Sequence, residues 1–196
     1  RTPNATAGEK VASETIMGLG SGSVNQTINY VYDDDEYLTG IGPMTLTYNV
    51  PNGQLTKTVL SKIKDFYTYN SYGEITKYVV KSGSIVIYQY DLIKDVLGRI
   101  TQKTELLSGV TTVFDYFYDA AGRLIEVHKN NVTESTYSYD DNSNRIGGSV
   151  RGVNTSASYD EQDRLTVYNG TPLTYNTNGE LLAKGAATFV YDVFGN

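Results

Sequence analysis

The chain lacks several residue types on which common protein functions depend. Its 196 residues include no cysteine, no tryptophan and a single histidine. The absence of cysteine excludes disulfides, thiolate metal sites and a cysteine nucleophile. The one histidine, His128, has no second histidine or cysteine with which to form a metal site or a catalytic relay. We expect His128 to be an exposed residue at the end of a strand.

Positive charge is also scarce. The 16 Lys and Arg residues are outnumbered by 22 Asp and Glu, the formal net charge is −6, and the basic residues form no cluster along the sequence. Binding to nucleic acid requires neutralisation of phosphates, so we expect no nucleic-acid partner. No apolar run is long enough to cross a membrane, and no signal peptide is visible at the first residue. We expect a chain that is not transmembrane and that is a piece of a longer polypeptide.

Tyrosine is the residue that the chain has in excess, with 18 copies against five phenylalanines. It recurs in a phrase that reads Tyr-x-Tyr-Asp or Asn, two variable residues, then Gly, a polar residue and Leu or Ile. We take the second tyrosine of each phrase as its anchor. The anchors are Tyr32, Tyr48, Tyr69, Tyr90, Tyr118, Tyr139, Tyr159, Tyr175 and Tyr191. Most intervals between anchors are 16 or 21 residues, and the 28-residue interval after Tyr90 predicts a lengthened turn.

Each phrase predicts a β-hairpin. The residues up to the anchor are β-branched or aromatic with period two, which is typical of a strand. The Asp or Asn after the anchor is expected to cap a turn by accepting a bond from an amide two residues on. The glycine three positions further is expected at positive φ. These turn residues are Asp119, Gly122, Asp140, Asp160, Gly179, Asp192 and Gly195.

Three details of the turns are less regular. Where glycine is missing, we expect Asn144 and Asp163 to take its place, because both residue types tolerate left-handed conformations. Glu36 does not fit this pattern, so the first unit is expected to be irregular. The odd number of turn residues predicts a β-bulge that keeps the tyrosine and the following leucine on one face.

The organisation that follows is an all-β chain of consecutive hairpins in a curved or spiralling antiparallel sheet. Residues 28–196 form the hairpin array, with about nine anchors. Residues 1–27 lie outside the repeats as an N-terminal segment and linker. Within them, 9–18 is the one stretch predicted to form a short helix, and the glycine-rich run 18–23 is predicted to be a loop.

Candidate chemical sites are weak. The acidic run 33–36 and the pair Asp140–Asp141 offer oxygen ligands for Ca²⁺, but both occupy turn positions where Asp is expected anyway. Any two of the acidic residues could form a glycosidase pair, so their number is not evidence. The recurring tyrosines suit either sugar stacking or packing, and packing is favoured because they recur at every anchor. We expect no cofactor, no metal and no catalytic residue. Five Asn-x-Ser/Thr sequons, at Asn4, Asn25, Asn131, Asn154 and Asn169, acquire meaning only in a glycosylating secretory route.

The phrase from Tyr118 to Leu124, Tyr-Asp-Ala-Ala-Gly-Arg-Leu, resembles the YD repeat of Rhs proteins, teneurins and the B and C components of insecticidal toxin complexes. Residues 191–196 resemble the Gly-Asn variant of this repeat, and weaker copies begin at Tyr69, Tyr159 and Tyr175. The resemblance implies one long sheet that spirals around a hollow interior, as a shell or an extracellular scaffold. This chain has too few hairpins to close a shell. It also lacks the Asp-Pro-Gly-type boundary of that family, so self-cleavage and toxicity are not carried over.

The functions expected from the resemblance are structural. We expect a non-catalytic shell segment of a large secreted or surface protein, whose partners are the rest of the parent polypeptide and an enclosed toxin domain. The alternative is an adhesion module whose Tyr-rich surfaces bind glycans or a cell-surface protein. Exposed sheet edges also predict self-association.

Overall fold

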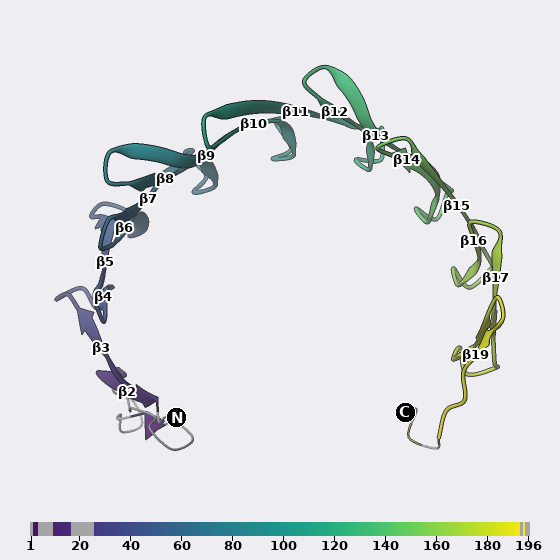
Figure 1. The fold of residues 1–196 in the computed structure, drawn as a ribbon, viewed down its shortest axis with the longest axis horizontal. Coiled ribbons are helices and arrows are strands. Elements are labelled where there is room, and N and C mark those ends of the chain that lie inside the picture. Colours follow the sequence, from purple (N-terminus) through teal and green to yellow (C-terminus); the bar gives the residue numbers. More distant parts are fainter. Residues whose placement is uncertain (1, 4–9, 17–25, 193, 195–196) are drawn as a thin grey trace. The chain divides into compact units, whose positions relative to one another are not determined.

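The structure is a computed structural model, and it describes residues 2–3, 10–16, 26–192 and 194 (Figure 1). Every regular element in this part of the chain is a β-strand, which confirms the all-β fold class. The strands are β1 (Thr2–Pro3), β2 (Ser13–Ile16), β3 (Gln26–Tyr32), β4 (Leu38–Ile41), β5 (Met44–Asn49), β6 (Gln54–Leu60), β7 (Ile63–Tyr69), β8 (Ile75–Ser82), β9 (Ile85–Lys94), β10 (Ile100–Leu107), β11 (Val110–Tyr118), β12 (Leu124–Lys129), β13 (Val132–Tyr139), β14 (Arg145–Val150), β15 (Val153–Tyr159), β16 (Leu165–Tyr168), β17 (Thr171–Tyr175), β18 (Leu181–Lys184) and β19 (Ala187–Thr188).

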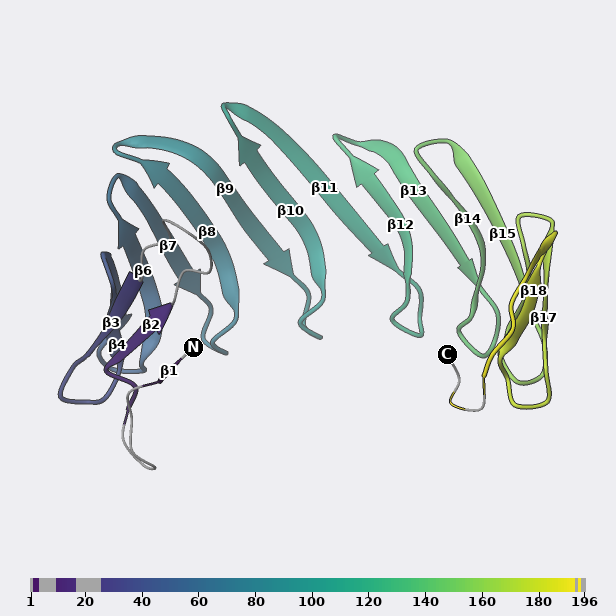
Figure 2. The same ribbon diagram turned by 60° about the horizontal axis from the view of Figure 1, so that its bottom comes forward.

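The chain divides into two compact units, which are described separately. The first comprises Arg1–Ile93 and Lys103–Thr111, and the second comprises Lys94–Gln102 and Thr112–Asn196. In the first unit, the strands from β1 to β9 pair antiparallel, each with the next in sequence. In the second unit, the strands from β11 to β19 pair in the same way (Figure 2). Each unit is therefore a curved sheet of consecutive hairpins, as the repeat predicts.

The two ends of each hairpin differ in their turns. One end has short turns whose residues adopt positive φ, such as Asn130 (50°) and Asn131 (66°) between β12 and β13. The other end carries the repeat phrase. There the register shifts between Phe117 and Tyr118, so that Tyr118 lies opposite Leu124. The same shift precedes six other anchors: Tyr32, Tyr48, Tyr69, Tyr139, Tyr159 and Tyr175. The predicted bulge is confirmed.

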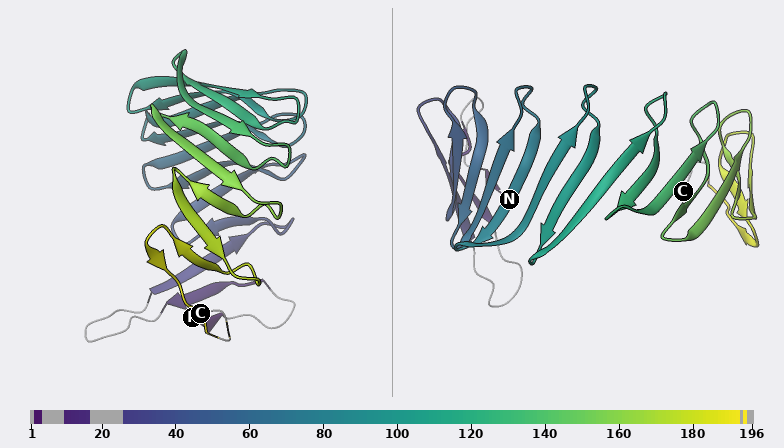
Figure 3. Two further views of the ribbon diagram at one scale, coloured as in Figure 1. Left: turned by 90° about the vertical axis from the view of Figure 1, so that its right-hand side faces the viewer. Right: turned by 90° about the horizontal axis from the view of Figure 1, so that it is seen from above.

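The sheet of each unit is a single layer with very little core (Figure 3). Within the described ranges, the only buried apolar side chains are Val79 and Val127, and the only buried polar ones are Thr58 and Ser135. Most strand residues are half-buried by their neighbours on one face. Side chains with an apolar ring and a polar tip suit such a surface, which explains the preference for tyrosine over phenylalanine.

The predicted helix at 9–18 is wrong where the structure describes it. Residues Ser13–Ile16 form β2, which pairs antiparallel with β3 from Ser13 opposite Asn29 to Ile16 opposite Gln26. The hydroxyls of Thr15 and Thr27 also lie 3.0 Å apart. A short segment gains more from the hydrogen bonds of a neighbouring strand than from an isolated helical turn. The glycine-rich run 18–23 lies outside the described residues. The described residues contain no helix suited to crossing a membrane.

Candidate functional site

The repeat phrase folds into a turn closed by both backbone and side-chain bonds. In the cleanest copy, the amide of Gly122 donates to the carbonyl of Asp119 at 3.0 Å, and the amide of Asp119 donates to the carbonyl of Arg123 at 2.9 Å. The Asp119 carboxylate accepts from the Arg123 amide at 2.8 Å and from its Nε at 2.7 Å. These bonds from the Arg123 backbone and side chain lower the pKa of Asp119. The aspartate therefore holds both corners of the turn and the first residue of the returning strand.

The same turn recurs along the chain. Turns with the same backbone bond begin at Asp33, Asn70, Asp95, Asp140, Asp160 and Asn176. The expected side-chain cap to the amide two residues on is present at Asn70, Asp95, Asp160, Asn176 and Asp192, with distances of 2.8–3.0 Å. Gly122 and Gly179 adopt φ of 83° and 86°, as predicted. Gly195 lies outside the described residues.

Two predictions about turns without glycine need correction. The residue at positive φ after Asp140 is Ser143 (φ 71°), not Asn144. Asn144 instead takes the place of Arg123, since its amide and its side chain both donate to the Asp140 carboxylate, at 2.8 and 3.1 Å. Asp163 adopts φ of 60°, as predicted. Glu36 adopts φ of 71° and its amide donates to the Asp33 carbonyl at 3.0 Å, so the first turn is regular after all.

The anchor tyrosines link neighbouring hairpins. The hydroxyl of Tyr139 donates at 2.7 Å to the carbonyl of Leu124, the first residue of the returning strand in the preceding repeat. Six further anchors make the corresponding bond to the preceding repeat or segment: Tyr32 to Val11, Tyr48 to Leu38, Tyr69 to Leu55, Tyr118 to Ile100, Tyr159 to Arg145 and Tyr175 to Leu165. We call this series of bonds the tyrosine ladder. It gives the hydroxyl group a structural role that the spacing of the tyrosines did not predict.

The turn arginines connect to the same ladder. The guanidinium of Arg123 lies over the ring of Tyr139 at 4.9 Å, and its Nη1 donates to the carbonyl of Asp140 at 2.7 Å. Arg99 and Arg164 lie in the same way over Tyr118 at 4.6 Å and over Tyr175 at 5.3 Å. The sequence signal for this contact is the arginine directly before the Leu or Ile of the phrase, at Arg99, Arg123 and Arg164.

Two anchors are placed differently. Tyr90 lies within β9, four residues before the strand ends at Lys94, and the next turn is an ordinary one from Asp95 to Gly98. The prediction of a lengthened turn is therefore wrong, because the extra residues extend the strand. Tyr90 contacts the ring of Tyr78 at 5.5 Å and is covered by Lys103 at 5.6 Å. Tyr191 lies after the last strand, outside any regular element.

His128 is not an exposed strand-end residue. It is the penultimate residue of β12, its side chain is 28% exposed, and its ring lies 4.7 Å from that of Phe117. Its Nε2 lies 2.9 Å from the Glu126 carboxylate. The contacts with His128 and Thr133 lower the pKa of Glu126. These contacts are those of a packed cross-strand residue.

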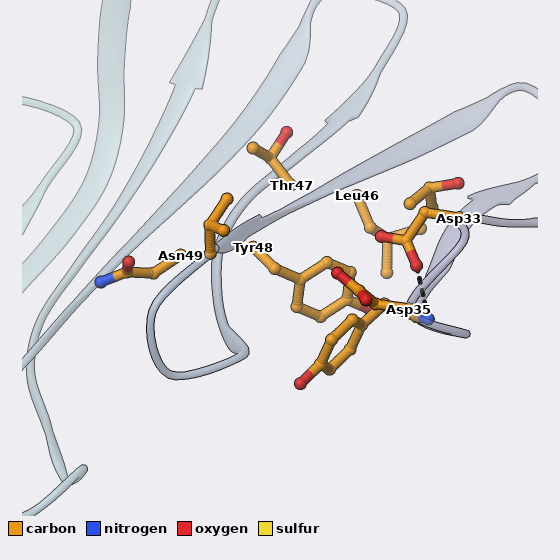
Figure 4. A pocket seen from close by; sticks show the side chains of 9 residues that line it. Asp33, Asp35, Leu46, Thr47, Tyr48 and Asn49 are labelled. Atoms are coloured by element: carbon orange, nitrogen blue, oxygen red, sulfur yellow. Dashed lines mark hydrogen bonds between the residues drawn. The ribbon is translucent and has the colours of Figure 1, made fainter.

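A small cavity lies beside the acidic run of the first unit (Figure 4). Its volume is about 220 Å³, and the rings of Tyr37 and Tyr48 lie 5.0 Å apart in its wall. Asp33 and Asp35 line the same cavity, as does Asn49. Burial and the nearby Asp33 raise the pKa of Tyr48. In the described ranges, no three acidic or histidine side chains are grouped as a metal site would require.

These features define a class of protein: a β-hairpin repeat protein in which a capped turn and a tyrosine bond join each unit to the one before. The chain belongs to the teneurin YD-shell family, whose sequence model matches residues 11–196. Teneurin-4 of Mus musculus and of Homo sapiens are each 31% identical to the chain over 174 residues. The aligned region is 85% of this chain and 6% of each relative, so the chain spans a small part of their length.

Solved structures have the same fold. The chain is similar to part of a Photorhabdus luminescens Tc holotoxin pore with a TM-score of 0.62 and 15% identity, covering 85% of this chain and 12% of that one. It is also similar to part of a TcdB2–TccC3–TEV structure, with a TM-score of 0.54 and 9% identity, covering 89% of this chain and 12% of that one. At these identities the likeness concerns the fold alone.

Proposed function

We propose that the chain is a non-catalytic structural segment of a large secreted or surface-displayed protein. It builds part of a shell that encloses or presents another domain, either a toxin or an adhesion domain. Its partners are then the rest of the parent polypeptide and that domain. The observation that carries this proposal is the tyrosine ladder, in which the hydroxyl group of the anchor tyrosine joins one hairpin to the hairpin before it.

The single-layer sheet supports the same proposal. A layer with almost no buried side chains gains its stability from neighbouring strands and leaves both faces free to meet something else. The pKa values of Asp119 and Asp160 are lowered chiefly by hydrogen bonds from Arg123 and Arg164 in the same turns. Such local partners are expected for aspartates that stabilise a turn, rather than for catalytic groups.

The parent polypeptide tests this proposal. We expect its reading frame to carry further YD phrases and a domain that resists protease in the intact protein but is digested once the hairpin array is disrupted. A parent that has no further repeats, or whose remaining domains are digested equally with and without an intact array, would contradict the shell role.

A second candidate is a glycan-binding adhesion module, and the cavity beside the acidic run favours it. Two aromatic rings with carboxylates and an amide nearby suit a pyranose ring. The aromatic rings can pack on the apolar face of the sugar, and the carboxylates and the amide can bond its hydroxyl groups. Tyr37 supplies one ring and is 41% exposed, so it is accessible to a ligand. A glycan array should give signals that Tyr37→Ala abolishes and that Tyr72→Ala, at an exposed turn position, leaves unchanged. No signal above background would remove this candidate.

Self-association belongs to the same proposal. A sheet of this kind has edges with unpaired backbone groups, and such edges tend to pair with another chain. We expect the isolated chain to form oligomers that grow with concentration in light scattering. A clean monomer at high concentration would contradict this expectation.

A further inference from the structure

Four lysines gather on one face of the first unit, although they are scattered along the sequence. Lys57 on β6 lies opposite Phe66 on β7, and Phe66 lies opposite Val79 on β8. Cross-strand partners share a face of the sheet, and so do residues two apart on one strand. Lys64, Lys77 and Lys81 therefore lie on the same face as Phe66 and Val79. We call this surface, made by Lys57, Lys64, Lys77 and Lys81 around Phe66 and Val79, the basic face (its strands are β6–β8 in Figure 2).

The charges of the basic face are not balanced within the chain. Lys64 and Lys81 lie directly opposite each other on neighbouring strands, an arrangement of like charges that destabilises a sheet. One carboxylate shares this face, Asp91, and it is bonded to Lys77 at 2.8 Å and to Gln89 at 2.6 Å. Among the described residues, no carboxylate lies within 4.0 Å of the Nζ atoms of Lys57, Lys64 or Lys81. The basic face is therefore a local excess of positive charge in a chain of net charge −6, and such a patch attracts anionic groups.

The basic face also carries apolar groups between its charges. Lys57 and Lys81 lie over the ring of Phe66 at 5.8 and 5.3 Å, and Val79 beside it is 8% exposed. Val59, opposite Lys64, belongs to the same face. Polysaccharides and nucleic acids offer little aliphatic surface, whereas a polypeptide can present carboxylates and apolar side chains together. The mixture therefore favours an acidic polypeptide over other polyanions.

The position of these strands limits how such a polypeptide could bind. Both β7 and β8 are paired along both of their edges, so an added strand could not bond to their backbone. A partner must meet the side chains of the face instead. Neighbouring strands are about 4.8 Å apart, and alternate residues along one strand are about 6.8 Å apart. The carboxylates of the partner have to match these spacings to contact several lysines at once.

We propose that the basic face is a docking surface for an acidic polypeptide segment, in which carboxylates alternate with apolar residues. The carboxylates contact Lys57, Lys64 and Lys81, and the apolar side chains pack on the half-buried side chains of Phe66 and Val59. The basic face would bind such a segment whether or not the sheet is part of a shell.

The test measures binding of three probes to the full 196-residue chain. They are a short peptide in which Glu alternates with Val and Ser, poly-L-glutamate, and heparin. In about 50 mM NaCl, where surface charges are weakly screened, we expect the alternating peptide to bind more tightly per charge than poly-L-glutamate or heparin. Lys64→Gln combined with Lys81→Gln should weaken its binding about tenfold, which corresponds to about 1.4 kcal/mol for the two exposed charge contacts together.

The matched control is the pair Lys129→Gln and Lys184→Gln, which removes the same charge from the second unit and should leave peptide binding unchanged. Thermal unfolding checks the fold, and the Lys64/Lys81 variant should be at least as stable as the parent chain because two opposed charges are removed. Equal losses in both double variants, tighter binding of heparin than of the peptide, or no binding of the peptide would each overturn the proposal.

Discussion

At the scale of single residues, the tyrosine hydroxyl distinguishes this chain from an ordinary half-buried sheet. The sequence predicts where the tyrosines recur, because their spacing is visible without a structure. It does not predict what the hydroxyls bond, because the carbonyl of Leu124 comes within reach of Tyr139 only through the register of two successive hairpins. The contact of Arg123 with the ring of Tyr139 depends on the same register, so the sequence does not predict it either.

Replacing Tyr139 with phenylalanine tests the hydroxyl alone. Tyr139→Phe keeps the ring under Arg123 but removes the 2.7 Å bond to the Leu124 carbonyl, which is left without that donor. We expect a loss of about 1 kcal/mol in the free energy of unfolding, the usual value for such a bond. Urea unfolding measures it. Tyr72→Phe is the control, because Tyr72 is 88% exposed, and it should be neutral. If Tyr139→Phe and Tyr72→Phe are equally stable, the hydroxyl bonds of the tyrosine ladder do not stabilise the fold.

Substitutions at the fourth position of each turn test how much the positive φ at that position costs in stability. Gly122 has φ of 83°, so Gly122→Ala should lose about 1 to 2 kcal/mol of unfolding free energy, the cost of a left-handed conformation for an L-residue. Glu36 occupies the same position with φ of 71°, so Glu36→Gly should move stability in the opposite direction. Calorimetry gives both values, and changes of the same sign would show that φ is not the cause.

At the scale of the element, the hairpin was predictable and its exceptions were not. The period-two pattern and the odd turn length led to the strands and the bulge. The segment 13–16 was mistaken for a helix because pairing with β3, which decides its conformation, is not a local property. The turn after Tyr90 was mistaken for a long one because Lys94, not a tyrosine, stands directly before Asp95. The repeat phrase therefore cannot be recognised at that turn from the tyrosines alone.

The turn aspartates make the hairpins sensitive to acid. The pKa values of Asp119 and Asp160 are lowered from 3.8, first by the backbone amides of Arg123 and Arg164 and also by their side chains. A carboxyl with a lower pKa in the folded state stabilises that state fully above the unfolded pKa, and this contribution is lost as the pH falls. We therefore expect the melting temperature to fall as the pH drops below about 3.8.

The double variant Asp119→Asn/Asp160→Asn is the control for this acid effect. Asn70 and Asn176 already cap their turns through a neutral amide oxygen, so the variant should fold with the same turns. Its melting temperature at neutral pH should be somewhat lower, because the ion pairs with Arg123 and Arg164 are lost, and its decline in acid should be shallower. An unchanged acid decline would assign the effect to other carboxylates.

At the scale of the whole molecule, the repeat makes stability a sum of neighbouring contributions. With Val79 and Val127 as the only buried apolar side chains in the described ranges, no shared core links distant hairpins. The basic face belongs to this scale as well. Its lysines show no pattern in the sequence, and only the register of β6, β7 and β8 brings them together. Binding surfaces of such sheets are therefore harder to predict than their folds.

Shortening the chain tests whether stability is a sum of local terms. A variant that ends after Gly170 lacks β17, β18 and β19, and with them the bond from Tyr175 to Leu165. In a repeat array each unit contacts only its neighbours, so we expect faster amide exchange in β16 and unchanged exchange in β12 and β13. The circular dichroism of the remaining strands should persist, with a lower melting temperature. If exchange accelerates equally in every strand, the hairpins unfold as one cooperative body, and the ladder transmits stability far beyond the neighbouring repeat.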